Sequence, residues 1–140
     1  MVEQGYEFFE HTADVGMRVY GASLRELFAY AAKGLTTLWV ESSSIASSET
    51  RPITLTADSV EELFGAWLKE LLFWFATDRF LPAEAAFETV TPTQLTGRVS
   101  GERFDPARHA AGTEVKGLTY HQFEIKHIAN GWEARVIFDV

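Results

Sequence analysis

The chain has 140 residues, no cysteine and a formal net charge of −8. This length suffices for one domain with a buried core, and the 46% share of hydrophobic residues is typical of a globular protein. The lack of cysteine excludes disulfides, thiolate catalysis and cysteine-ligated zinc. No segment approaches the ~20 apolar residues of a membrane-spanning helix. The first residues are too acidic for a secretory signal, so we expect a cytoplasmic protein.

The charge also bears on the partners of the protein. The twelve lysines and arginines are scattered along the chain, without the basic patch by which proteins usually hold nucleic acid. Direct, tight binding of RNA or DNA is therefore disfavoured, and no membrane partner is indicated. An acidic protein still has a route into nucleic-acid metabolism, because complementary charge speeds its docking onto a basic enzyme.

The first predicted elements are two short strands, residues 6–9 and 15–20, on either side of a turn at residues 11–14. The second strand alternates apolar and other side chains with the period of a strand. Ser23 and Glu26 then have the spacing of a capping box. Apolar residues at i, i+3 and i+4 follow, which predicts a helix of about four turns with one buried stripe. The stripe consists of Leu24, Leu27, Phe28, Ala31, Leu35 and Leu38.

The middle of the chain predicts a loop, a strand and a second helix. Residues 40–51 are rich in serine and are expected to form a mobile loop, followed by a short strand at residues 52–56. Ser59 and Glu62 repeat the capping-box spacing and open the helix. Its sequence is apolar on nearly every side toward its C-terminal half, so we expect this to be the central buried helix.

The last third of the chain predicts four strands in two hairpins, with a polar loop at residues 101–108 between them. The second hairpin is joined at Asn130-Gly131, a dipeptide suited to a type I′ turn. The predicted strands are residues 80–90 with 94–100, and 116–127 with 132–140. The order of elements predicts an α+β fold, with two helices packed on mostly antiparallel sheets, in a single domain over residues 1–140.

Two carboxylates stand out because of their positions in the chain. Asp139 lies within a strongly apolar strand pattern, where aspartate is disfavoured, and Asp14 follows the first predicted strand. If the fold brings them together with the α-carboxylate of Val140, three negative groups converge, and such a cluster is costly unless a hard cation binds. Plainer interpretations stay open: Asp14 as a turn residue that caps backbone amides, and Asp139 as a solvated residue near a strand end.

Three other residues carry weaker signals. His11 beside Asp14 resembles part of a transition-metal site, but zinc requires three or four ligands, and oxygen ligands favour calcium or magnesium. Lys116 and His121 have opposite parity and cannot both face one side of a regular strand; a strand with a polar outer face is the plainer interpretation. No Ser-His-Asp elbow, phosphate-binding glycine loop or HExxH motif is present. We therefore predict no catalytic residue.

Taken together, the motifs resemble the archease family. They occur in the order of the family and span nearly the whole chain, and the set is specific. Gly117 departs from the family pattern, in which alanine is expected. The matching segments are His11 to Gly16, Gly21 to Leu24, Glu26 to Phe28, Ala31 to Leu35, Glu114 to His121, and Val136 to Val140.

The resemblance implies an accessory protein rather than an enzyme. Archeases assist the RtcB-type RNA-splicing ligase, which joins tRNA halves through a guanylylated histidine. They promote that guanylylation and multiple turnover. The resemblance thus implies the ligase as partner, with GTP and tRNA reached only through the ligase.

The resemblance also assigns residues. It implies a divalent-metal site whose ligands map onto Asp14, Asp139 and terminal Val140, with calcium as the expected cation and magnesium or manganese as alternatives. Lys116 matches a functional position of the family, whereas His11 and His121 match positions for which we expect structural roles or roles around the ligands. Such a site would leave about half of the ~6–8 positions of calcium open to water, a phosphate or a partner's carboxylate.

Two other functions remain alternatives. One is a stand-alone metal-dependent hydrolase of phosphoesters or nucleotides at the same acidic cluster, with Lys116 as the only good candidate for a base or an electrophilic group. The other is a chaperone-like interaction module that uses the serine-rich loop or an aromatic surface.

Overall fold

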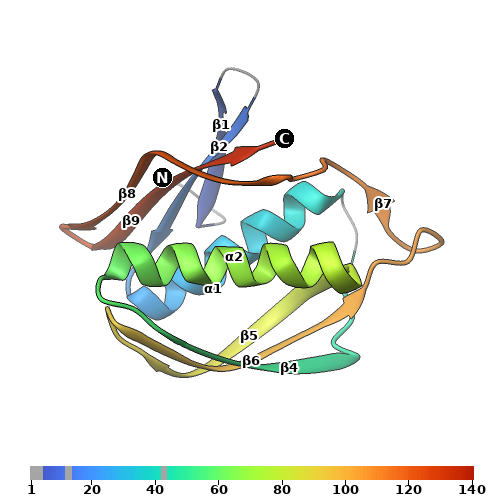
Figure 1. Ribbon diagram of the computed structural model, residues 1–140, viewed down its shortest axis with the longest axis horizontal. Helices are drawn as coiled ribbons and strands as arrows, with labels where there is room; N and C mark the ends of the chain where they lie inside the picture. Colours follow the sequence, from blue (N-terminus) through green and yellow to red (C-terminus); the bar gives the residue numbers. More distant parts are fainter. Residues whose placement is uncertain (1–4, 12–13, 42–43) are drawn as a thin grey trace.

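Two antiparallel sheets enclose two helices in the computed structural model, which describes residues 5–11, 14–41 and 44–140 (Figure 1). The four-stranded sheet has the order β1 (Tyr6–His11), β2 (Asp14–Gly21), β9 (Gly131–Asp139), β8 (Gly117–Ile128). The three-stranded sheet has the order β4 (Glu49–Thr56), β6 (Gln94–Arg103), β5 (Phe80–Val90). The helices are α1 (Leu24–Trp39) and α2 (Val60–Asp78), and β3 (Val40–Glu41) pairs with β7 (Ala110–Ala111). The predicted α+β class is confirmed.

Each helix buries its apolar side because both sheets turn an apolar face toward the helices. Helix α1 contacts β2 on one side and β5 on the other, and α2 contacts β8 and β5. The indole N–H of Trp67 donates to the Phe28 carbonyl at 2.9 Å, so a buried polar group of α2 is satisfied by α1. Neither helix is long and apolar enough to cross a membrane, and no other helix occurs in the described residues.

Both capping motifs form, with one difference from the predicted pattern. The Ser23 hydroxyl accepts the Glu26 N–H, and the Ser59 hydroxyl accepts the Glu62 N–H, each at 3.2 Å. The two glutamates reach back one residue further than in the usual capping box, to the amide before the cap. At its far end, α2 is less buried than predicted, because Phe73 is 60% exposed.

The predicted serine-rich loop is shorter in the structure than in the sequence pattern. Its end belongs to β4, which begins at Glu49 opposite Gly101 of β6. Contacts of Arg51 hold this extension in place: it forms ion pairs with Glu49 at 2.7 Å and with Asp78 at 3.0 Å. Its guanidinium also lies 4.3 Å from the centre of the Phe80 ring. The loop prediction was wrong for residues 49–51, because serine-rich and charged segments are typical of loops although these residues form a paired strand.

The type I′ turn predicted at the last hairpin is wrong. The connection is Ala129–Asn130, since Ile128 pairs with Gly131 as the first residue of β9. Among the described residues, the only non-glycine residues with positive φ are Arg79 and Gln122, whereas a type I′ turn needs positive φ at both central positions. Gly131 is required for a different reason: it has φ +142°, and a Cβ there would lie 2.2 Å from the Gly21 carbonyl oxygen.

Strand β8 is interrupted by a bulge. Thr119 pairs with Ile137 and Glu124 with Arg135, so four residues of β8 stand against one of β9. Within this bulge Gln122 adopts φ +57°. The predicted opposite parity of Lys116 and His121 therefore does not apply, because the strand between them is not regular.

Replacing Ser59 tests whether this capping residue stabilises the N-terminus of α2. Ser59→Ala removes the side-chain acceptor of the Glu62 N–H and is expected to lower the free energy of unfolding by about 1 kcal/mol. Ser47→Ala, at an exposed loop position, is the control and should change it by less than ~0.5 kcal/mol. Denaturant unfolding measures both; equal values for the two variants would contradict the role of the cap.

Candidate cation site at the end of the four-stranded sheet

The two aspartates singled out in the sequence are direct neighbours in the fold. Asp14 of β2 and Asp139 of β9 are paired residues in the antiparallel ladder. The same row continues to His11 of β1 and Gly117 of β8. We call these four residues the acidic row. Side chains of directly paired residues lie on the same face of a sheet, with Cβ atoms ~4.5–5.5 Å apart.

The acidic row faces away from the helices. Met17, Val136 and Phe138 are fully buried in the core on the helical side of the sheet. Because side chains alternate along a strand, Asp14 and Asp139 lie on the opposite, outward face. Asp139 is exposed and Asp14 half-buried, so a ligand from solvent reaches both.

The arginines on this face lie away from the acidic row. The next charged pair along the strands is Arg18 with Arg135, four residues from the aspartates and thus ~13 Å away. These arginines have acidic neighbours of their own, Glu7 at 3.9 Å and Glu124 at 3.5 Å. Like charges directly opposite each other destabilise a sheet, so a cation at the row would be favoured.

Lys116 lies at the same end of the sheet. Its backbone N–H donates to the Asp139 carbonyl at 2.7 Å, which attaches the start of β8 to the end of β9. The Lys116 side chain is exposed. Next to it, Gly117 has no heavy atom within 4 Å of a Cβ position, so the space beside Asp139 is open. Val140 follows Asp139 and is half-buried.

The two predicted histidines have different outcomes. The backbone of His11 belongs to the acidic row, while its side chain lies outside what the structure describes. His121 is exposed and lies in the β8 bulge, where its N–H donates to the Thr119 hydroxyl at 3.1 Å. The structure therefore does not bring His121 into the row.

The donor set fits a hard cation. The row supplies two carboxylates, and oxygen ligands of this kind suit calcium, magnesium or manganese rather than zinc. No group of three His, Cys, Asp or Glu side chains with metal-site geometry occurs among the residues described. Asp14 and Asp139 would thus provide only part of a coordination shell, to which Val140 would add one oxygen donor.

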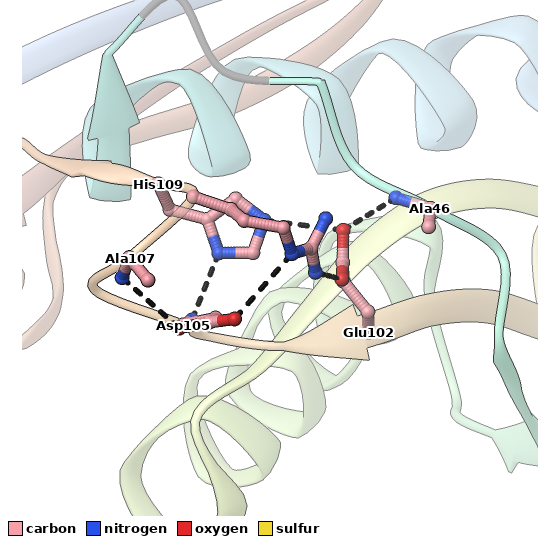
Figure 2. Close-up of polar contacts among 6 residues, drawn as sticks. Ala46, Glu102, Asp105, Ala107 and His109 are labelled. Atoms are coloured by element: carbon pink, nitrogen blue, oxygen red, sulfur yellow. Dashed lines mark hydrogen bonds and ion pairs between the residues drawn. The ribbon is translucent and has the colours of Figure 1, made fainter.

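A buried polar cluster lies at the end of β6, where the sequence pattern predicted only a polar loop (Figure 2). Glu102 is buried and its carboxylate accepts the Ala46 N–H at 2.6 Å. It also contacts the Arg108 guanidinium and the His109 Nε2, the latter at 3.1 Å. His109 is buried too, and its Nδ1 accepts the Asp105 N–H at 2.9 Å. Because Nδ1 is an acceptor, the proton of this imidazole lies on Nε2 and is donated to Glu102.

This cluster anchors the segment that leads to Lys116. Beyond His109, the N–H of Gly112 donates to the Trp39 carbonyl at 2.8 Å, and the N–H of Thr113 to the Leu38 carbonyl at 2.6 Å. The crossover from β6 to β8 is thereby held against the end of α1. Isolated polar residues in a proline-containing stretch have no periodic pattern, so their burial could not be predicted from the sequence.

Substitution of the buried carboxylate tests this anchor. Glu102→Gln places an amide group among three donors, and we expect it to lower the free energy of unfolding by roughly 1.5–3 kcal/mol, the range for hydrogen bonds to charged groups. The control is Glu84→Gln on the exposed side of β5. Urea unfolding of both variants gives the comparison, and indistinguishable midpoints would show that the cluster does not stabilise the fold.

Comparison with known proteins identifies close likenesses. The family model described as "Archease protein family (MTH1598/TM1083)" matches residues 6–140. The protein archease of Methanosarcina acetivorans is 33% identical over 146 residues and is covered completely, as is this chain. That of Saccharolobus islandicus is 36% identical over 140 residues, covering 98% of this chain and 99% of its own length.

Two solved structures have the same fold. The solution structure of Methanobacterium thermoautotrophicum protein 1598 has a TM-score of 0.80 at 34% identity, over 98% of this chain and 99% of its own. The crystal structure of a Thermotoga maritima archease, described as a possible chaperone, has a TM-score of 0.64 over 94% of each chain. At 20% identity the latter is evidence of the fold alone.

Proposed function

The chain belongs to the archease family, and from this premise we propose that it activates an RtcB-type RNA-splicing ligase through a divalent cation held at the acidic row. The observation that carries the proposal is the direct pairing of Asp14 with Asp139 on the outward face of the sheet. In this function the chain promotes guanylylation and multiple turnover of the ligase, and it meets GTP and tRNA only through that enzyme.

The proposed ligands of the cation come from the first residue of β2, the last residue of β9 and the residue that follows it. Asp14 and Asp139 would supply carboxylate oxygens, with Val140 as the third donor. A bound calcium ion would supply positive charge and open coordination positions to a phosphate or a carboxylate of the ligase. The incomplete shell favours an ion shared with a partner over an ion enclosed by this chain.

Lys116 would act beside the cation. The hydrogen bond from its N–H to Asp139 keeps the start of its side chain next to the row, and the exposed ammonium group is able to contact a phosphate that approaches the cation. The net charge of the whole chain also favours this partner, because a formal net charge of −8 complements a basic RNA-binding enzyme.

Removal of the carboxylate charges tests the cation site directly. Asp14→Asn and Asp139→Asn should each weaken calcium binding by at least tenfold in calorimetric titration, since a neutral amide is a poorer ligand for a hard cation. Each should also abolish stimulation of ligase guanylylation. Glu84→Gln is the control and should retain both properties. Unchanged calcium affinity and full stimulation in both aspartate variants would contradict the proposal.

An assay of the purified chain without the ligase distinguishes an activator from a stand-alone hydrolase. Incubated alone with nucleotides and RNA phosphates, the chain is expected to release no phosphate. Release that disappears in Asp14→Asn would instead support the hydrolase.

A separate substitution tests Lys116. Lys116→Ala should lower ligase stimulation by roughly tenfold or more, the effect of losing a charge-assisted contact, while calcium affinity stays unchanged. Lys126→Ala, at an exposed position farther along β8, is the matched control. Guanylylation assays at limiting ligase measure the effect, and wild-type stimulation by Lys116→Ala would exclude a role for the ammonium group.

A further inference from the structure

One side of α2 is not covered by either sheet. The helix lies at the front of the layer between them (Figure 1), and its solvent side carries Glu62, Ala66, Lys69 and Phe73 at helical spacing. Phe73 is 60% exposed, and Tyr120 of β8 is 54% exposed. These two are the most exposed large hydrophobic side chains among the residues described.

The β8 bulge brings aromatic side chains onto this side of α2. The Tyr120 ring lies 4.7 Å from the Lys69 Nζ and 5.1 Å from the Phe123 ring. A side chain at Gly65 would meet the Tyr120 hydroxyl, 3.0 Å from its Cβ. The bulge contains the strained backbone of Gln122, and conformations of this kind are concentrated at functional sites.

Helix α2 and the bulge together form a groove of about 420 Å³. We call it the aromatic groove; its lining residues are Glu61, Glu62, Ala66, Lys69, Tyr120 and Phe123. We propose that the aromatic groove, with Phe73 beside it, is the surface on which the chain docks to the partner enzyme, and that it receives an apolar side chain flanked by lysine or arginine. This inference rests on the proposed function.

The form of β8 and the charge of the groove select this occupant. β8 is an edge strand, but the bulge interrupts its backbone ladder, which disfavours addition of a partner strand. We therefore expect the partner to contact the side chains of this surface and not the backbone of β8. The groove has an aromatic wall, one exposed lysine, Lys69, and an exposed acidic rim at Glu61 and Glu62. The two carboxylates outnumber the single ammonium group, so an apolar group with basic neighbours at the rim complements the groove.

The groove is close enough to the acidic row for one partner to cover both. Tyr120 is three residues along β8 from Gly117, a separation of roughly 10 Å. A protein interface of standard size buries about 800 Å² on each partner, which corresponds to a patch roughly 30 Å across. Because the acidic row faces outward and Tyr120 faces α2, a ligase that shares the cation at Asp139 reaches Tyr120 around the edge of the sheet that β8 forms.

Binding of the chain to the ligase, measured by calorimetry or biolayer interferometry, tests the docking surface. Tyr120→Ser and Phe73→Ser should each weaken binding by about tenfold or more, as expected for aromatic residues at the centre of an interface. Maximal stimulation at saturating chain and calcium affinity should stay unchanged. Tyr120→Phe should retain binding. Phe8→Ser, at the third exposed large hydrophobic residue, lies on β1 at the opposite edge of the sheet and should leave binding unchanged.

A charge reversal gives a second, independent readout. Glu61→Lys should weaken binding and make it less dependent on salt, whereas Glu88→Lys, at an exposed position of β5, should do neither. Wild-type affinity in Tyr120→Ser, Phe73→Ser and Glu61→Lys, or an equal loss in Phe8→Ser, would overturn the docking surface alone. Binding by the wild-type chain without stimulation would overturn only the proposed function, and absence of binding would overturn both.

Discussion

The pairing of β2 with β9 is the constraint on which the rest of the structure depends. It joins segments from the two ends of the chain, Asp14–Gly21 and Gly131–Asp139, in one continuous antiparallel ladder. Met17 and Val136 face each other across this ladder and are fully buried. A shift by one residue would move the core-facing side chains of the strand, Val136 and Phe138 among them, to the outward face. The same register that fills the core therefore places Asp14 opposite Asp139.

The outward face of this sheet carries two pairs of like charges, which differ in the charged residues that the outer strands place beside them. Arg18 and Arg135 are flanked by glutamates on the outer strands, so the row as a whole is neutral. The acidic row has Gly117 on the β8 side, where a counter-charge would otherwise stand. This contrast supports the proposed cation at the end of the sheet that holds the aspartates, whereas the glutamates already balance the arginines.

Strand β8 connects the acidic row with the aromatic groove. Its first residues border the acidic row, and its bulge turns Tyr120 and Phe123 onto α2. The segment that enters it is held by the buried pair of Glu102 and His109 and by hydrogen bonds to the end of α1. These contacts of one continuous segment thus determine where Lys116, the acidic row and the aromatic groove lie relative to one another.

Local patterns in the sequence determined much of the fold. The caps at Ser23 and Ser59, the alternation in β2 and β9, and the hairpin of β5 and β6 depend on neighbours a few residues apart, and these predictions were confirmed. The position of Asp139 in an apolar strand was also visible, because a carboxylate interrupts the alternation that surrounds it. The amino-acid sequence therefore contains a clue to the candidate site.

Tertiary structure alone decided which segments meet. That β2 pairs with β9, that the helices lie between two sheets, and that Glu102 and His109 are buried result from contacts between residues far apart in the chain. Short-range periodicity contains no information about such partners. The β8 bulge has the same origin, since three additional residues can be recognised only once β9 provides the register. The sequence by itself thus indicated that Asp14 and Asp139 are unusual, and long-range packing made them neighbours.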